Sequence, residues 1–289
     1  MITQQPGKPQ RIVVTGAGGQ LGAELAQLPK AEGIEIIALS RSDLDVTDSE
    51  QCRAVLTKHC PDAIIHCGAY TAVDKAESEP DEAFRVNGAG TRNLAVAASA
   101  AGIKLCYIST DYVFDGTGAV PYNEYDHTNP QTVYGKSKLA GEYAVQTMHN
   151  RFFIVRTSWV YGKYGNNFVK TMLKMGKERD SLKVVSDQLG SPTYTYDLAH
   201  FLLELVQTEN YGIYHASNTG TCSWHEFAQA IFEESGIKAQ VDPCTTDEFP
   251  RPAPRPAYSV MDHSAIRSND FQPLRPWREA LQHYLKDSE

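Results

Sequence analysis

Long apolar runs, paired cysteines and an excess of positive charge are all missing from this sequence of 289 residues. No apolar run reaches the roughly 20 residues that a membrane-spanning helix needs, and in the polar segment 1–10 we expect no secretory signal. The six cysteines form no C-x-x-C pair, which argues against a zinc site or a disulfide framework and predicts reduced thiols in the cytoplasm. The net charge of −8 argues against nucleic acid as a partner. Local cations and helix N-termini can still hold an anionic small molecule.

A glycine-rich turn between a strand and a helix is the first feature that indicates a ligand. The segment Arg11–Thr15 is typical of a buried strand, and Ala23–Leu28 is typical of a helix. Between them, Gly16, Gly19 and Gly22 allow a tight turn, close approach of a pyrophosphate and close packing of the helix. The helix N-terminus adds free N–H groups and a partial positive charge. This context predicts a dinucleotide site rather than a turn without a ligand.

The end of the second predicted strand bears on which dinucleotide binds. An acidic residue at that place usually holds the ribose 2′-OH of NAD. After the strand Glu35–Leu39 this chain carries Ser40 and Arg41, whose hydroxyl and guanidinium suit a 2′-phosphate and favour NADP. The alternative is an exposed arginine beside Asp43. Asp45, a little further on, is a candidate to face the adenine.

Two more predicted strands end in small or hydroxyl side chains. The strand 63–67 runs into Gly68 and Ala69, which would let the backbone approach a cofactor, and the strand 104–108 runs into Thr110. We expect His66 to pack within its strand rather than bind a ligand. Strands alternate with helices, including a predicted helix over 81–101. The predicted fold class is therefore α/β, a doubly wound parallel sheet of the Rossmann type whose strand carboxyl ends converge on the ligand.

Tyr134 and Lys138 form the most specific pair in the sequence. We expect a helix to begin at Pro130, and on it the two side chains lie four residues apart on one face. An ammonium beside a phenol favours the phenolate, so we predict a tyrosine pKa below its usual value of about 10. Such a phenol can exchange a proton near neutral pH. A chance surface pair is the alternative, but no other tyrosine of the chain has a lysine at this spacing.

The second half predicts a smaller lobe on the same sheet. After a fifth strand at 151–156 we expect a helix over 166–177, a strand over 182–185 and a helix over 196–207 that returns to the sheet. A helix over 223–235 and the proline-rich run 250–256 follow, and the arginines 251 and 255 of that run are candidates to grip a diphosphate or, alternatively, belong to a solvated loop. We therefore predict a dinucleotide-binding domain over 1–162, with the return over about 187–217, and a C-terminal α/β substrate-binding lobe over 163–186 and 218–289. Trp277 and Tyr284 are expected to pack that lobe.

Several motifs together resemble a known superfamily. They are T-G-x-x-G-x-x-G at 15–22, Asn87 followed by G-T-R-N-L at 90–94, and Tyr134-x-x-x-Lys138 preceded by Thr110. These are similar to the extended short-chain dehydrogenase/reductase superfamily. Y-T-A-V-D-K-A-E at 70–77, S-T-D-Y-V-F-D-G at 109–116 and R-T-S-W-V-Y-G at 156–162 most closely resemble its dTDP-4-dehydrorhamnose reductase family. This resemblance runs from about residue 11 almost to the C-terminus.

The resemblance implies an enzyme that reduces the C4 carbonyl of dTDP-4-dehydro-L-rhamnose with NADPH, giving dTDP-L-rhamnose for cell-surface polysaccharide. Thr110, Tyr134 and Lys138 match the catalytic residues, with Tyr134 as proton donor, Thr110 as hydrogen-bond donor to the same sugar oxygen, and Lys138 reaching the nicotinamide ribose. Further cofactor positions that match are Gly19, Gln20, Leu21, Asp45, Val46, Gly68, Ala69 and Thr71. The positions assigned to the sugar nucleotide are Val73, Thr110, Asp111, Tyr112 and Trp159, to which the proline-rich run adds Arg255.

Two departures and two alternatives accompany this resemblance. The family often carries an acid where Ser40 stands, so NADPH is favoured here and NADH stays an alternative. Some relatives hold magnesium with glutamates at a dimer contact. Glu24 fits one such position but no matching acid stands near Thr195, so we assign no metal ligand and leave magnesium and a homodimer open. The alternatives are a sugar-nucleotide epimerase or dehydratase, disfavoured because no glutamate follows Asp111, and a non-catalytic NADP-binding regulatory subunit, disfavoured because Thr110, Tyr134 and Lys138 are all intact.

Overall fold

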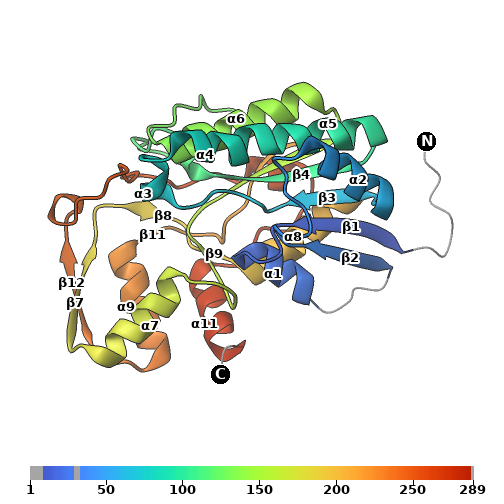
Figure 1. The fold of residues 1–289 in the computed structure, drawn as a ribbon. Coiled ribbons are helices and arrows are strands. Elements are labelled where there is room, and N and C mark those ends of the chain that lie inside the picture. Colours follow the sequence, from blue (N-terminus) through green and yellow to red (C-terminus); the bar gives the residue numbers. More distant parts are fainter. Residues whose placement is uncertain (1–8, 29–32, 288–289) are drawn as a thin grey trace.

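The fold is built on one parallel sheet of six strands (Figure 1). The computed structural model describes residues 9–28 and 33–287. The sheet has the order β10-β5-β4-β3-β1-β2, and every neighbouring pair is parallel. Its strands are β1 (Gln10–Thr15), β2 (Ile34–Leu39), β3 (Ala63–His66), β4 (Lys104–Thr110), β5 (Phe152–Thr157) and β10 (Gly212–His215). The strand order reverses between β1 and β3, which is where such sheets bind ligands outside their carboxyl ends.

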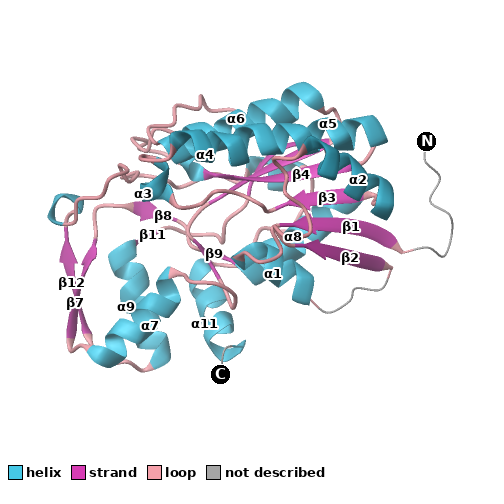
Figure 2. Ribbon diagram, in the orientation of Figure 1, coloured by secondary structure: helices cyan, strands magenta, loops and turns pink. Residues whose placement is uncertain are grey.

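Helices cover both faces of this sheet (Figure 2). Along β1, Ile12 and Val14 belong to one buried cluster and Val13 to another, because successive strand residues point to opposite faces. The cluster that contains Val13 packs against α2 (Ser49–His59), α5 (Thr91–Ala101) and α6 (Val133–Met148). The other packs against α1 (Gln20–Gln27), α8 (Thr195–Gln207) and α10 (Ser264–Ser268). The predicted doubly wound α/β class is confirmed.

A third buried cluster belongs to a smaller group of elements beside the sheet, at the lower left of Figure 1. Trp277 and Tyr284 pack in this cluster, as predicted. Its helices are α7 (Phe168–Glu178), α9 (Trp224–Ser235) and α11 (Trp277–Asp287), and its strands β7 (Ser181–Val185) and β12 (Gln240–Cys244) pair in parallel. Two short strand pairs lie between this group and the sheet: β6 (Val160–Tyr161) with β9 (Thr193–Tyr194), and β8 (Leu189–Gly190) with β11 (Cys222–Ser223).

Two predicted helices differ from the observed ones. The expected helix over 81–101 is divided into α4 (Pro80–Phe84), a π-helical turn η1 (Arg85–Gly90) and α5. Within η1 the Asn87 side chain accepts a hydrogen bond from the Tyr70 N–H and donates one to Ser137 Oγ. The π-helical turn is therefore hydrogen-bonded to the loop at Tyr70 and to α6. The expected start at Pro130 is wrong by three residues. Thr132 is the N-cap of α6, because its hydroxyl accepts from the Gly135 N–H at 3.0 Å.

The C-terminal segment after residue 262 also departs from the predicted division. We assigned 218–289 to the smaller lobe, but Ile266, Phe271 and Leu274 pack in the cluster on the sheet, beside α1 and α8. The segment returns to the sheet because Glu124 accepts hydrogen bonds from Ser264 Oγ and the Ala265 N–H at the start of α10. The boundaries of two domains stay a prediction. Among the described residues, no helix is long and apolar enough to cross a membrane.

Candidate active site

The carboxyl ends of the strands open into one large pocket of about 1290 Å³. Thr15, Gly68, Thr110 and Thr157 all line it, from β1, the loop after β3, β4 and β5. Drug-sized ligands usually occupy about 300–1,000 Å³. The pocket is therefore somewhat larger than a usual ligand site.

The glycine-rich turn forms one end of the pocket and fits a pyrophosphate. A Cβ at Gly22 would overlap the carbonyl oxygen of Gly16, so the helix packs tightly on the turn. Gly19 is the N-cap of α1 and offers no side chain to the first N–H groups of that helix. A helix N-terminus without a side-chain cap presents N–H donors and a partial positive charge to an anion. These residues therefore fit the diphosphate of a dinucleotide.

Of the two residues after β2 that we predicted to bind the 2′-phosphate of NADP, only one lines the pocket. Arg41 lines it, with a side chain that is 77% exposed and 4.0 Å from Glu82. Ser40 is not among the residues that line it, so its assignment to the cofactor stays a prediction. The Ser40 hydroxyl donates to Asp43 Oδ2 at 2.6 Å and lies 2.7 Å from Ser42 Oγ, so this side chain closes the turn instead.

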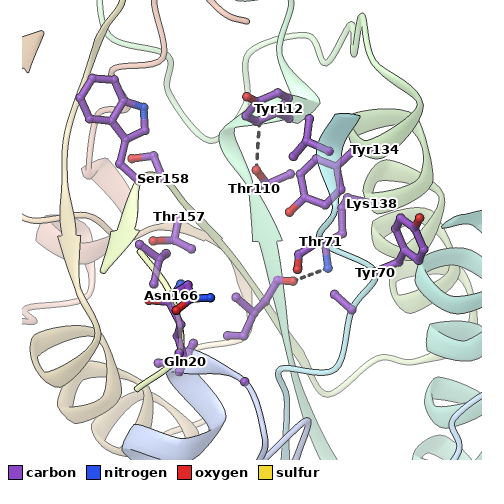
Figure 3. A pocket seen from close by; sticks show the side chains of 18 of the residues that line it. Gln20, Tyr70, Thr71, Thr110, Tyr112, Tyr134, Lys138, Thr157, Ser158 and Asn166 are labelled. Carbon is purple, nitrogen blue, oxygen red and sulfur yellow. Dashed lines mark hydrogen bonds between the residues drawn. The ribbon is translucent and has the colours of Figure 1, made fainter. Parts of the chain in front are cut away.

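Thr110, Tyr134 and Lys138 meet on the opposite wall (Figure 3). Thr110 ends β4, and Tyr134 and Lys138 project from the first turns of α6. A Cβ at Gly135 would overlap the Tyr112 carbonyl, so α6 approaches the end of β4 as closely as a glycine allows. This packing holds the tyrosine near the threonine, as the spacing of the motif predicted.

The predicted lowering of the Tyr134 pKa is wrong. Burial raises the pKa of Tyr134 well above its usual value; the Thr110 hydrogen bond partly offsets this and the Asp111 charge adds to it. Burial also lowers the pKa of Lys138 to about 7, against the opposing effect of Glu142. Lys138 Nζ donates to the Ile108 carbonyl at 2.7 Å and lies 4.0 Å from the centre of the Tyr107 ring. The effect of burial on the pKa of Tyr134 therefore outweighs any effect of the Lys138 ammonium.

Asp111 is a buried carboxyl beside these residues. Thr110 Oγ1 donates to Asp111 Oδ1 at 2.8 Å and accepts from the Tyr112 N–H at 3.2 Å. Burial raises the pKa of Asp111 to about 6, although hydrogen bonds from Thr110 and Ser259 lower it. Because a hydroxyl has a single proton, Thr110 cannot donate to a substrate oxygen while it donates to Asp111.

Trp159 forms a wall of the pocket and also packs. Its φ is +47°, a conformation that non-glycine residues adopt rarely and often at functional sites. Its indole stacks on Trp224, with ring centres 3.6 Å apart and planes at 10°. Both indoles line the pocket, and Trp159 also joins the cluster of the smaller lobe. Trp159 is therefore both a wall of the pocket and a packed residue.

An ion pair joins the two sides of the pocket mouth. Arg255 Nη2 lies 2.8 Å from Asp74 Oδ2, and the Ala253 N–H donates to Asp74 Oδ1 at 3.3 Å. Asp74 is on α3 (Val73–Ala76), whereas the other two residues belong to the proline-rich run. The sequence motif did not reveal Asp74 as a partner, because 181 residues separate it from Arg255. Arg251 also lines the pocket.

Comparison with known proteins agrees with this geometry. The family model described as RmlD substrate binding domain matches residues 10–289. A dTDP-4-dehydrorhamnose reductase of Streptomyces griseus is 46% identical over 94% of this chain and 91% of its own length. The chain belongs to the dTDP-4-dehydrorhamnose reductase family. The Bacillus subtilis protein named spore coat polysaccharide biosynthesis protein SpsK is 47% identical, over 96% of this chain and 97% of its own.

Solved structures of the family have the same fold. The crystal structure of dTDP-4-dehydrorhamnose reductase from Bacillus anthracis in complex with NADP has a TM-score of 0.95 and 48% identity, and covers 96% of this chain and 99% of its own. A UDP-glucose 4-epimerase of Thermus thermophilus complexed with NAD has a TM-score of 0.81 but only 20% identity, over 96% of this chain and 98% of its own. The second likeness concerns the fold alone.

Most of the site residues that we predicted from the sequence line this one pocket. They are Gly16, Gly19, Gln20, Leu21, Gly22, Arg41, Asp45, Val46, Gly68, Ala69, Thr71, Val73, Thr110, Asp111, Tyr112, Tyr134, Lys138, Trp159 and Arg255. Ser40 is the exception. The sequence analysis missed an apolar end of the pocket, lined by Phe168, Met172, Met175, Val184 and Trp224. Phe168, Met172 and Met175 stand at helical spacing, which by itself indicates only the packed face of a helix. The sequence therefore carried no signal that these side chains line the pocket.

Glu24, the residue that we considered for a metal position, takes part in a buried contact. Glu24 is buried, and its Oε2 accepts a hydrogen bond from Thr195 Oγ1 at 2.7 Å. Burial raises the pKa of Glu24. Within residues 9–28 and 33–287, no three His, Cys, Asp or Glu side chains gather in a way that could hold a metal ion. Magnesium and a homodimer both stay open.

Proposed function

We propose that this protein reduces the C4 carbonyl of dTDP-4-dehydro-L-rhamnose with NADPH and so completes dTDP-L-rhamnose. One observation carries the proposal: a single pocket joins the phosphate-binding turn at one end to Thr110, Tyr134 and Lys138 on its wall. Its volume lies above the usual range of about 300–1,000 Å³ for a ligand pocket. When bound, NADPH supplies the hydride. Every other part of the reaction falls to side chains of this chain.

The residues at the first end fit NADPH. The turn from Gly16 to Gly22 and the N-terminus of α1 hold the diphosphate. Arg41, which is exposed and lines the pocket, pairs with the 2′-phosphate. Asp45 and Val46 lie along the same stretch of the pocket, toward the adenine. Without Ser40, the preference for NADPH over NADH rests on Arg41.

Tyr134 gives the proton that the reduced oxygen requires. Hydride addition turns a carbonyl oxygen into an alkoxide, so a proton must arrive in or near the transition state. Because burial raises its pKa, Tyr134 carries its proton at neutral pH and is ready to donate. Lys138, whose pKa burial lowers to about 7, stands one helical turn away and orients the cofactor ribose. Thr110, at the end of β4 beside the phenol, donates its hydroxyl proton to Asp111 at 2.8 Å.

The sugar nucleotide occupies the other part of the pocket. The stacked Trp159 and Trp224 offer a flat apolar surface, and Arg255 at the mouth offers a guanidinium for a diphosphate. Val73, Asp111 and Tyr112 line the same pocket. We place the reaction in the cytoplasm, where free thiols such as the six unpaired cysteines are maintained.

One assay tests this proposal. The protein is mixed with dTDP-4-dehydro-L-rhamnose and NADPH, and the absorbance of the reduced nicotinamide is followed. We expect absorbance to fall in proportion to the sugar nucleotide added. Binding of both ligands without any loss of absorbance would contradict the proposal and favour the regulatory-subunit alternative.

A further inference from the structure

We infer that Tyr107 is a positioning residue for Lys138, because the face of its ring carries the buried lysine ammonium. This inference rests on the proposed reductase function, in which Lys138 orients the cofactor ribose. Lys138 Nζ lies 4.0 Å from the centre of the Tyr107 ring. The Tyr107 hydroxyl donates to the Lys138 carbonyl at 3.2 Å. One side chain therefore contacts both the charged end and the backbone of the lysine.

The packing around Tyr107 fixes its ring and its hydroxyl. Tyr107 lies in β4 and is fully buried. A Cβ at Gly141 would overlap the tyrosine hydroxyl, so this glycine makes room for the hydroxyl against α6. The His66 imidazole packs on the ring with centres 5.7 Å apart, and its Nδ1 lies 2.7 Å from Thr15 Oγ1. The ring is therefore held in place by neighbours from β3 and α6.

The contacts of the lysine nitrogen give the ring its role. An ammonium has three N–H donors. The Ile108 carbonyl accepts one of them at 2.7 Å, and the negative face of the Tyr107 ring attracts the charge. In the described part of the chain, no carboxylate oxygen lies within 4.0 Å of Lys138 Nζ, and Glu142, one helical turn on, pairs with Arg156. The ring therefore supplies the stabilisation that an acidic partner would otherwise give.

The charge of Lys138 depends on a balance between burial and its neighbours. Burial lowers the pKa of Lys138 to about 7, and the Glu142 and Cys67 charges act in the opposite direction. Burial keeps His66 neutral by lowering its pKa to about 3. The titratable groups around the lysine are Tyr107 on β4, His66 on β3, Cys67 after it, and Tyr134 and Glu142 on α6. Because a cation on a desolvated ring is favoured over the neutral amine, loss of the ring should lower the pKa of Lys138 further.

The first test needs no substrate or cofactor. In protein labelled with ¹³C at the lysine Cε, the Lys138 signal is titrated by NMR spectroscopy, and Lys138→Met identifies it. We expect a midpoint near 7 in the wild type and in Tyr107→Phe, which keeps the ring. In Tyr107→Leu the midpoint should be lower by roughly 0.5–1.5 pH units, the usual strength of a buried cation–π contact.

Tyr214→Leu is the matched control for that titration. Tyr214 is also buried in a strand of the sheet, and its hydroxyl donates to a carbonyl, but it packs in the cluster on the other face. This variant should leave the Lys138 midpoint in place. A midpoint that Tyr107→Leu does not lower, or that Tyr107→Phe or Tyr214→Leu lowers as much, would overturn the inference.

A second set of variants keeps the shape of the ring and changes only its charge distribution. Phenylalanines with one, two or three fluorine atoms, placed at position 107, have progressively less negative ring faces. We expect the Lys138 midpoint to fall stepwise with the number of fluorine atoms. These variants keep the core filled, so they decide the question even if Tyr107→Leu does not fold. A midpoint that fluorination does not change would overturn the inference.

Kinetics connects the contact to turnover. The alkaline limb of kcat/KM for NADPH should move to lower pH in Tyr107→Leu by the amount that the titration gives. The charged fraction of Lys138 at pH 8 would then be about 3- to 30-fold smaller. A limb that stays in place in Tyr107→Leu, or that moves equally in Tyr107→Phe, would overturn the inference. If the wild type oxidises no NADPH, the proposed function fails, and the titration still decides whether the ring carries the ammonium.

Discussion

Tyr134 is the residue on which the proposed chemistry depends most directly. Tyr134→Phe keeps the ring and its edge-on contact with Tyr112 but removes the proton. We expect kcat to fall by about 10²–10⁴-fold, with NADPH binding retained because the turn at 16–22 is untouched. Rapid kinetics and a fluorescence titration of NADPH measure the two effects. Tyr125→Phe, at a tyrosine that is 90% exposed, serves as the control; near wild-type kcat in Tyr134→Phe would exclude the tyrosine as the acid.

Arg41 and Ser40 form a matched pair for the choice of cofactor. Arg41→Ala should weaken NADPH binding by roughly ten- to hundredfold, the usual worth of a charge-assisted contact, and leave NADH nearly unchanged. Ser40→Ala should change the binding of neither cofactor, because the Ser40 hydroxyl donates to Asp43 and the residue does not line the pocket. Dissociation constants for both cofactors check this. Equal losses for NADPH and NADH in Arg41→Ala would show that the guanidinium does not contact the 2′-phosphate.

The buried carboxyl of Asp111 also affects stability. Its pKa is raised to about 6 in the folded protein, above the usual value of about 3.9. The stability that the protonated form contributes is complete below about pH 4 and is lost as pH rises through 6. Asp111→Asn does not titrate, so its Tm should rise relative to wild type between these pH values, by the equivalent of about 3 kcal/mol at most.

Asp115 provides a control of opposite sign for that measurement. Hydrogen bonds from Thr117 and Tyr122 lower the pKa of Asp115, so its contribution is present at neutral pH and is lost on acidification. Asp115→Asn should therefore lower the Tm at neutral pH and matter less in acid. Thermal unfolding across this pH range measures both variants. A constant difference in Tm between Asp111→Asn and wild type would contradict the raised pKa.

At the scale of elements, a buried ion pair ties α6 to the sheet behind the site. Glu142 on α6 accepts from Ser109 Oγ at 2.5 Å and from Arg156 Nη2 at 2.7 Å, and it is fully buried. Removing one partner leaves an uncompensated charge, so Glu142→Gln should cost about 3–5 kcal/mol of unfolding free energy. The double variant Glu142→Leu/Arg156→Met should cost less than the sum of its single variants. Urea unfolding measures all of them, and additive costs would show that the pair is not coupled.

The sequence predicted the strands and the ends of the sheet well, because their signals are local. A buried strand appears in the sequence as a short apolar run. The glycine turn and the Tyr134–Lys138 spacing identify the segments that follow these strands. The π turn at 85–90 could not be predicted, since Asn87 is drawn into it by Tyr70 and Ser137, which are distant in sequence. The tyrosine pKa was predicted in the wrong direction because spacing reveals the neighbouring ammonium and does not reveal burial. The hydrogen bond from Ser40 to Asp43 could not be predicted either, because it depends on the local turn.

At the scale of the whole molecule, the pocket is shared between the sheet and the smaller lobe. The sheet supplies the groups that motifs identify, whereas the lobe supplies Met172, Met175 and Trp224, whose role depends on where α7 and α9 pack. The Asp74–Arg255 pair joins the two sides at the mouth. Contacts between segments so far apart in the chain are a property of the fold, so no local pattern could predict this half of the site.

The most direct test of the central claim follows the transferred hydrogen itself. NADPH that carries deuterium at the transferable C4 position of the nicotinamide is incubated with the protein and dTDP-4-dehydro-L-rhamnose, and the product is examined by NMR and mass spectrometry. The account predicts deuterium at C4 of dTDP-L-rhamnose, with one oxidised cofactor for each labelled sugar. Product without label, or sugar nucleotide recovered unchanged beside intact labelled NADPH, would contradict it.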